Sequence, residues 1–454
     1  MNPLTTSRTP PTVEQPAADR PLAGRSPAAA PGTGRSARRP APPSGGRYAR
    51  LPQLAGRGFL PIAFLARLPL AMITVGALTL ATAVTGSYAS GGLAAGAVGI
   101  GSALGGPLMG HLADRAGQRA VLLASAVVHA VAVAVLLAAA YVPLAPGGPA
   151  VPALVGACLL VGATCPQVSP LARVRWRALT GGRREELDTA LSYESTADEL
   201  TFVLGPALVG LLASLVTPWA PFVLAGVLTL TMVALFAVHP THLAVPAASR
   251  EARRRAAVRS TARERVLVLL PVLGMVAMGT FFGAVQNALN AFGGALGAHS
   301  AAGLLYAVLG ISSAAAALSV AWWPQRFRPA ARWVAGAAAM AALSPLLLLP
   351  GGLVPMLAVL LVVGVPVGPT MVTVYTIGGD VARPERLGTV MTLLASGVVL
   401  GTAVGATLAG VLAESAGHRG AFAVAAGAAL AMTAISGAAA LLVRRDRGPA
   451  LDER

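Results

Sequence analysis

The sequence predicts an all-α protein that crosses a membrane many times, and its composition and apolar runs carry this prediction. Of its 454 residues, 55% are hydrophobic and only 11% are charged. A soluble protein would carry about 25% charged residues, so this chain has too little polar surface to cover a soluble globule. Runs such as 59–83, 119–142 and 353–376 are long enough to cross a hydrocarbon core of about 30 Å as helices. A secreted enzyme, a coiled coil and a cytosolic Rossmann protein are therefore excluded.

Breaks at glycine, proline and charged residues divide the chain into twelve candidate membrane spans. The predicted spans are 59–83, 92–112, 119–142, 150–172, 192–216, 218–238, 266–289, 301–323, 331–350, 353–376, 388–412 and 420–443. Six spans lie on each side of a polar linker at 239–265. This arrangement predicts a six-helix bundle over 58–238, a second over 266–443, and basic tails at 1–57 and 444–454.

The two sets of six spans resemble each other, which predicts pseudo-symmetric halves. Residues 205–225 match 405–425 at seven of 21 positions, and 92–100 align with 303–311 through two glycines, a leucine and an isoleucine. Two parallel six-helix halves with a substrate site between them are the architecture of a secondary transporter.

The placement of arginine predicts the orientation in the membrane. All 34 basic residues are arginine, and all but Arg67 and Arg419 lie in or beside alternate connections and the two tails. Basic residues gather on the cytoplasmic side of membrane proteins. We therefore expect a multi-pass protein of the inner (plasma) membrane with both termini and the linker in the cytoplasm. The net charge of +17 then belongs to a collar beside the lipid bilayer, and no nucleic-acid partner is expected.

The tail and the linker have compositions that cannot form a core. Residues 1–57 carry nine arginines against Glu14 and Asp19 and are rich in Pro, Ala, Gly and Ser, so we expect them to be disordered. The linker 239–265 carries seven arginines and two glutamates, and we expect it to lie near anionic headgroups.

The connection after the second predicted span carries a motif of glycines and charges. It reads Gly110-His-Leu-Ala-Asp114-Arg115-Ala-Gly117-Gln-Arg119. This motif resembles the signature loop of the major facilitator superfamily, G-x-L-A-D-R-x-G-R-[KR], with Gln118 where arginine is common. With the twelve spans, the linker and the repeat, the resemblance runs from about 59 to 443. It implies the fold of that superfamily and transport by alternating access.

The same loop supplies the candidate gating residues. They are Gly110, Asp114, Arg115, Gly117 and Arg119. The two glycines allow a tight turn and close packing. The resemblance implies that Asp114 faces the start of the eleventh span near Gly388 and Thr389, where the helix dipole stabilises a carboxylate by about 0.3–1 kcal/mol. The alternative is that these charges only set topology. Gln325 holds the equivalent position in the second half, so we expect a latch on one side only.

Three charges within the predicted spans are the candidate proton-coupling group. Arg67 in the first span and Asp198 and Glu199 in the fifth lie roughly 10–12 Å inside the membrane at helical rise. Each costs at least about 2.5 kcal/mol unless it is paired or hydrated. Spans one and five pack together in the superfamily, which implies that the three residues cluster. One carboxylate is then in surplus and suits a proton carrier; a structural ion network is the alternative. We expect Glu194 to face water, and Arg173 to be an interface anchor or a partner of the Asp114 loop.

Amide and aromatic side chains within the spans are the candidate substrate-binding residues. Gln286, Asn287 and Asn290 lie within an arc of about 100° on the seventh span. The resemblance implies that this span lines the central cavity, whereas hydrogen bonding between helices is the alternative. Gln167 in the fourth span and Tyr375 in the tenth are further candidates on the same ground.

Motifs for enzymatic chemistry are absent from the sequence. We find no P-loop, no H-E-x-x-H and no G-x-S-x-G, and the six histidines form no metal cluster in the sequence. We therefore expect neither an enzyme nor a bound cofactor or metal. Gly205-Pro206 with Gly210 partly resembles the Gly-Pro motif of drug/proton antiporters, although a helix kink explains it equally well.

We expect a monomeric secondary active transporter that exports a small amphipathic drug or metabolite in exchange for protons. Its sequence resembles transporters of actinobacterial type, which include many presumed exporters. A proton symporter or facilitator that imports a small polar solute is the main alternative. A non-transporting membrane scaffold or sensor is a minor one.

Overall fold

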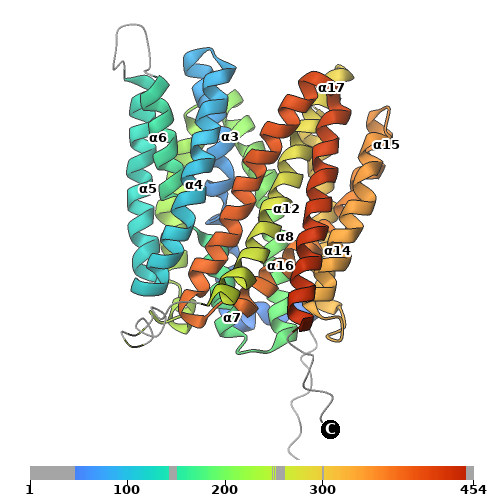
Figure 1. The fold of residues 1–454 in the computed structure, drawn as a ribbon. Coiled ribbons are helices and arrows are strands. Elements are labelled where there is room, and N and C mark those ends of the chain that lie inside the picture. The colour runs from blue at the N-terminus through green and yellow to red at the C-terminus, as the bar shows by residue number, and fades with distance from the viewer. Residues whose placement is uncertain are drawn as a thin grey trace, which may run out of the picture. The chain divides into compact units, whose positions relative to one another are not determined.

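Long apolar helices form the body of the protein (Figure 1). The computed structural model describes residues 46–142, 151–247, 249, 251, 261–298 and 301–445. Eleven helical segments among them are long and apolar enough to cross a membrane. The last, α17 (Leu387–Arg445), has 59 residues and a non-helical backbone at Gly417, so it contains the last two predicted spans. The predicted all-helical, twelve-span fold is confirmed.

The N-terminal half contains six spans, three of which are interrupted. Its elements are α2 (Phe59–Leu65), α3 (Leu68–Thr85), α4 (Tyr88–Ala116), α5 (Gln118–Tyr141), α6 (Val151–Thr164), α7 (Val168–Leu179), α8 (Arg184–Leu215), α9 (Ala220–Leu228), the π-helix η2 (Thr229–Val233) and α10 (Ala234–Val238). Prolines explain two of the interruptions: Pro69 lies in the first turn of α3, and Pro166 separates α6 from α7. The breaks before α3 and α7 place Arg67 and Gln167 at the N-caps of these helices.

The C-terminal half repeats this pattern. Its elements are α12 (Ala262–Ala295), α13 (Ala301–Ser319), η4 (Val320–Trp322), α14 (Pro329–Leu343), η5 (Ser344–Leu348), α15 (Leu353–Gly364), α16 (Val367–Val381), η6 (Pro384–Arg386) and α17. A capping box begins α12, because Thr261 and Glu264 satisfy each other's backbone N–H groups. The tenth span is broken between α15 and α16, as the fourth is broken between α6 and α7.

The N-terminal segment differs from the prediction. Residues Arg47–Arg50 form a 3-10 helix, η1, and Leu51–Ala55 form α1. Leu51 and Ala55 are buried in an apolar cluster with Phe59, so the chain is folded well before the predicted boundary at residue 57. A short apolar patch beside the first span supplies the burial that the basic tail lacks. Residues 1–45, 446–454 and most of the linker (248, 250 and 252–260) lie outside the described residues.

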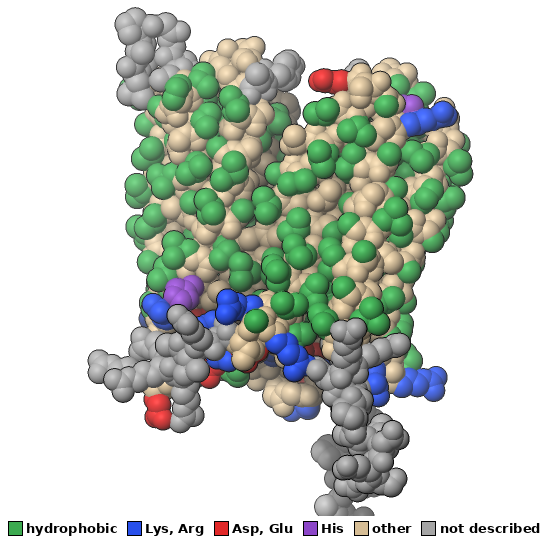
Figure 2. All heavy atoms as spheres, in the orientation of Figure 1, with side chains coloured by type: hydrophobic (Ala, Val, Ile, Leu, Met, Phe, Trp, Pro, Cys, Tyr) green, Lys and Arg blue, Asp and Glu red, His purple; other side chains and the backbone are tan. Residues whose placement is uncertain are grey.

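The surface has an apolar belt and one charged end. Leu104 of α4 and Val354 of α15 expose 68% and 76% of their surface, as side chains that face lipid do. In Figure 2 the basic side chains in view gather at the lower end of the molecule. We call the lower end, which holds the α4–α5 turn and the starts of α8, α12 and α17, the arginine-rich end.

The two halves meet at the arginine-rich end and separate toward the other. There α4 packs on α17 and α8 packs on α13. A Cβ at Gly106 of α4 would lie 2.6 Å from Ser396 Oγ of α17. Further along the same face of α4, a Cβ at Gly92 or Gly99 would have no described neighbour within 4 Å. Figure 1 agrees, because the first part of α17, in orange, meets the lower end of α4 and leans away from it toward the top.

Glycines let α12 and α17 approach closely, and we predict that a methyl group is too large at their contact. A Cβ at Gly405 would clash with the carbonyl oxygen of Thr280. Gly405→Ala should therefore destabilise the protein by about 1–3 kcal/mol through overpacking. Gly427→Ala is the matched control, because Gly427 is exposed on the same element and a Cβ there meets nothing within 4 Å. Thermal unfolding in detergent measures both, and equal midpoints would contradict the prediction.

Candidate functional site

Four buried charges lie at the centre of the N-terminal half. Arg67 lies at the break between α2 and α3, Arg173 lies on α7, and Glu194 and Asp198 lie on α8. The exposed fraction of each of these residues is 9% or less. The break at Arg67 brings its side chain toward α8. We call these four residues the central charge cluster.

The central charge cluster is a balanced set of ion pairs. The Arg67 guanidinium contacts the Glu194 carboxylate, and its Nη1 lies 3.4 Å from Asp198 Oδ1. Arg173 Nη2 lies 2.8 Å from Asp198 Oδ2. Two arginines thus face two carboxylates, and the cluster carries no net charge. Pairing of this kind offsets the cost of burying each ion.

Neutral groups complete the cluster and connect it to the other half. Trp176 Nε1 donates to Glu194 Oε1 at 2.7 Å, and Ser169 Oγ donates to Asp198 Oδ2 at 2.8 Å. The Arg173 guanidinium lies over the ring of Tyr375, a residue of α16, at 3.8 Å from the ring centre. Tyr375, a predicted cavity residue, therefore contacts the charge cluster across the interface between the halves.

Two expectations about these charges were wrong, and Arg173 was only partly anticipated. Glu194 does not face water but is fully buried against Arg67. Glu199 does not join Arg67 and Asp198, since successive helical residues point about 100° apart. Arg173, expected at the interface or beside Asp114, instead binds Asp198. The signal for Glu194 was available, because residues four apart, such as Glu194 and Asp198, share a helix face.

Glu199 occupies a separate site at the contact between the two halves. Its Oε1 accepts a hydrogen bond of 2.6 Å from Ser313 Oγ on α13, and its Oε2 is buried without a hydrogen-bond partner. Among the described residues, no basic group lies within ion-pair distance of this carboxyl group. One turn earlier on α8, Thr196 Oγ1 donates to the carbonyl oxygen of Ala314 at 3.1 Å. Glu199 is thus an unpaired acid held between α8 and α13.

The other predicted cavity residues separate into two groups. Gln286 and Asn290 are exposed on α12, and no hydrogen bond joins either to a described residue. Asn287 Nδ2 donates to the carbonyl oxygen of Ala406 at 2.7 Å, which is the helix-packing alternative. Gln167 is buried at the α6–α7 break and donates to the carbonyl oxygen of Cys165 at 3.2 Å. Gln286 and Asn290 are therefore the amides left available to a ligand.

The predicted gating residue Asp114 lies against the start of α17. Its Oδ1 accepts from the Gly388 N–H at 2.8 Å, and its Oδ2 accepts from the N–H and hydroxyl of Thr389 at 2.8 and 2.7 Å. A Cβ at Gly388 would lie 2.5 Å from Asp114 Oδ1, so this approach needs glycine. We call this contact the Asp114 latch.

The remaining residues of the predicted gating loop surround this latch. Gly110 lets α4 lie close to Thr392 of α17, and Gly117 makes the α4–α5 turn at φ +88°. The side chains of Arg115 and Arg119 are exposed at the arginine-rich end.

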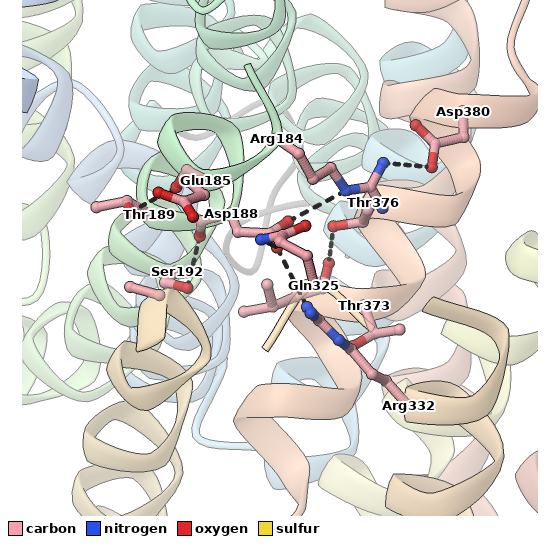
Figure 3. A network of polar contacts seen from close by, with 12 residues as sticks. Arg184, Glu185, Asp188, Thr189, Ser192, Gln325, Arg332, Thr373, Thr376 and Asp380 are labelled. Carbon is pink, nitrogen blue, oxygen red and sulfur yellow. Dashed lines mark hydrogen bonds and ion pairs between the residues drawn. The ribbon is translucent and has the colours of Figure 1, made fainter. Parts of the chain in front are cut away.

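A second contact between the halves is an ion pair between α8 and α14, which corrects the expectation of a one-sided latch (Figure 3). Asp188 at the start of α8 lies 3.2 Å from Arg332 Nη1 and accepts a hydrogen bond of 3.4 Å from Gln325 Nε2. Gln325 is therefore a donor, and the acid comes from the opposite half. Arg184 Nε lies 3.6 Å from the other carboxylate oxygen of Asp188, Oδ1. We call these four residues the Asp188 network.

Asp380 at the end of α16 adds a third contact. Its two carboxylate oxygens lie 2.7 Å from Arg177 Nη2 and 2.9 Å from Arg184 Nη1. Arg184 thus connects Asp380 to the Asp188 network, as Figure 3 shows. Together with the Asp114 latch, these contacts close the arginine-rich end of the interface. Sequence reasoning missed Asp188 and Asp380 because each pairs with an arginine of the other half.

We predict that weakening the Asp114 latch opens the arginine-rich end. Asp114→Asn keeps one acceptor oxygen and places an amide N–H₂ against the backbone N–H of either Gly388 or Thr389, so at least one charge-assisted bond of about 1.5–3 kcal/mol is lost. In a protein whose Cys158 and Cys165 are replaced by alanine, a cysteine substituted for Thr392 reports the opening.

The measurement is the rate at which that cysteine reacts with a soluble thiol reagent. Asp114→Asn should raise the rate about tenfold or more, whereas the control Glu385→Gln, which removes an acid beside the same helix start, should leave it unchanged. Equal rates in both variants would show that Asp114 holds nothing closed.

Comparisons with known proteins agree with this architecture. Residues 59–394 match the Major Facilitator Superfamily. Among solved structures, the human organic anion transporter MFSD10 (TETRAN) is similar with a TM-score of 0.65 and 19% identity, covering 84% of this chain and 99% of that one. No curated protein matches the sequence.

Two further structures share the fold. A bacterial homologue of the iron transporter ferroportin has a TM-score of 0.60 and 14% identity, covering 84% of this chain and 98% of that one. The E. coli fucose:proton symporter FucP has a TM-score of 0.55 and 16% identity, with the same coverage of 84% and 98%. The match over most of the chain places this protein among membrane transporters rather than enzymes: it belongs to the major facilitator superfamily.

Proposed function

We propose that the protein is a proton-coupled exporter of a small amphipathic drug or metabolite. It works as a monomer in the inner membrane, with the arginine-rich end in the cytoplasm as the arginine bias favours. The halves rock about the central interface and expose the substrate site to one side at a time. Glu199 carries the proton.

The observation that carries this proposal is the isolation of Glu199. A buried carboxylate without a cation is costly, so the protonated form is favoured while α8 and α13 hold it between them. Asp198 differs, because Arg67 and Arg173 both pair with its carboxylate. When α8 and α13 separate, water reaches Glu199 and the proton can leave. Movement of the halves and release of a proton are thereby linked.

The closed arginine-rich end supports alternating access. The Asp114 latch, the Asp188 network and Asp380 join the halves there, whereas α4 and α17 separate toward the opposite end. With the arginine-rich end in the cytoplasm, this conformation faces outward. The substrate can then enter from the cytoplasm only when these three contacts break and the arginine-rich end opens.

The charges near the interface favour a substrate without a strong net charge. The central charge cluster is balanced, so it offers no excess charge to an anion or to a metal ion. The available amides, Gln286 and Asn290, give directional hydrogen bonds within otherwise apolar helices. An amphipathic molecule with a few polar groups fits this combination.

The proposal is tested by accumulation of fluorescent amphiphiles in an efflux-deficient bacterium. Cells that produce the protein should accumulate less than vector controls, and a protonophore should abolish the difference. Cells that produce Glu199→Gln should behave like the vector control. A difference that survives the protonophore would contradict proton coupling, and protonophore-sensitive accumulation above the vector control would establish the importer instead.

A further inference from the structure

The segment Arg47–Ala55, which precedes the first span, reaches from one half of the protein to the other. It comprises η1 and α1, and it lies at the arginine-rich end. We call it the N-terminal strap. The superfamily match begins after it, at residue 59.

The strap is anchored on the N-terminal half by burial. Leu51 and Ala55 are 1% and 5% exposed, and they belong to the apolar cluster that includes Phe59 and Trp176. Arg50 adds an ion pair of 3.7 Å with Glu186 at the start of α8. These contacts stay within one half, so they are not disturbed when the halves move as rigid bodies.

The other end of the strap contacts the C-terminal half through hydrogen bonds and ring packing. Tyr48 Oη donates to the carbonyl oxygen of Leu318 at 2.7 Å, and the Arg47 guanidinium donates to the carbonyl oxygen of Ala321. The Tyr48 ring also packs edge-on against Trp322, with 5.5 Å between ring centres. Burial raises the pKa of the Tyr48 phenol to about 12, so the hydroxyl stays protonated as a donor.

The strap contacts the end of α13 and η4, and the chain continues from there to Gln325 of the Asp188 network. Val320 of η4 packs on Leu187 and Leu191 of α8. Gln325, five residues further on, donates to Asp188. Any motion that separates α8 from α13 at this end must therefore break the bonds of Tyr48 and Arg47 as well.

We propose that the N-terminal strap is a clamp that holds the arginine-rich end closed and sets how often the transporter opens to that side. The clamp rests on the proposed alternating access, because it has an effect only if that end opens. It acts through two side chains outside the transport pathway. A segment that only completed the fold of the N-terminal half would need Leu51 and Ala55 but not these two contacts across the interface.

The distance between spin labels on the two halves tests the clamp. The labels replace Ala178 at the end of α7 and Arg326 after η4, both exposed, in a protein with Cys158 and Cys165 replaced by alanine. The test variant combines Tyr48→Phe with Arg47→Ala and keeps the buried anchor intact. Arg57→Ala is the matched control: it removes one positive charge from an exposed residue just after the strap.

The strap variant should raise the population of the longer distance about threefold to tenfold, as expected for the loss of two hydrogen bonds. The control should match the parent in its distance distribution. The parent, the strap variant and the control should unfold at nearly the same temperature. An unchanged distance distribution in the strap variant would overturn the clamp. Asp114→Asn with the same labels separates two causes of that result: if it lengthens the distance, only the clamp is wrong, and if it does not, the gating of this end is wrong as well.

Discussion

Arg67→Met should destabilise the protein by about 3–5 kcal/mol, the cost of leaving a buried charge without its partner. Arg67 binds both Glu194 and Asp198, and Glu194 has no exposed surface. Removing the arginine leaves two carboxylates against Arg173 alone. Thermal unfolding in detergent should show a large loss of stability, and little folded protein should be recovered from membranes.

The compensating variant separates this charge effect from a loss of packing. Arg67→Met combined with Glu194→Gln removes one charge of each sign and leaves the pair of Arg173 and Asp198. The glutamine side chain keeps an oxygen that can accept from Trp176 Nε1. The double variant should recover most of the lost stability. If it is as unstable as the single variant, the cluster is held by packing and not by charge balance.

Glu199→Gln should abolish proton-driven transport while leaving the protein folded. Glutamine resembles the protonated acid in shape and can still accept the hydrogen bond from Ser313 Oγ. It cannot release a proton, so protonophore-sensitive transport should fall at least about tenfold, within the range of measured effects of lost proton transfer. The measurement is net transport against a substrate gradient in proteoliposomes with an imposed pH gradient.

Exchange of substrate without a pH gradient distinguishes uncoupling from damage. The Glu199→Gln protein should still exchange labelled for unlabelled substrate, because the halves can still rock. Glu185→Gln, which removes an exposed acid from the start of the same helix, should keep both activities. Proton-driven transport that survives in Glu199→Gln would assign the proton to another residue.

The sequence alone predicted the architecture because the membrane dictates it. The thickness of the hydrocarbon core sets the length of each apolar run, and the arginine bias marks one end. The apolar runs and the arginine bias are local, so they can be read from neighbouring residues. The position of Asp114 against Gly388 and Thr389 followed instead from the resemblance of its loop to the signature loop of the superfamily.

The pairing of the buried charges could not be predicted in the same way. Depth in the membrane suggested that Asp198 and Glu199 share a site, but adjacent residues face different directions, and only Glu194 shares the face of Asp198. Arg173 reaches Asp198 because the helix breaks before α7, and the periodicity of apolar residues does not predict that contact. Arg332, which pairs with Asp188 across the interface, lies 144 residues away in the sequence, so only the packed halves reveal the contact.

Protonation of Glu199 can be measured without knowing the substrate. Infrared difference spectra of the protein in lipid, recorded as the pH is raised, detect the carbonyl stretch of a protonated carboxyl group as it disappears. The account predicts that wild type and Glu185→Gln show this signal and that Glu199→Gln lacks it. A signal that remains unchanged in Glu199→Gln, or that is absent from the wild type, would contradict the assignment of Glu199 as the proton carrier.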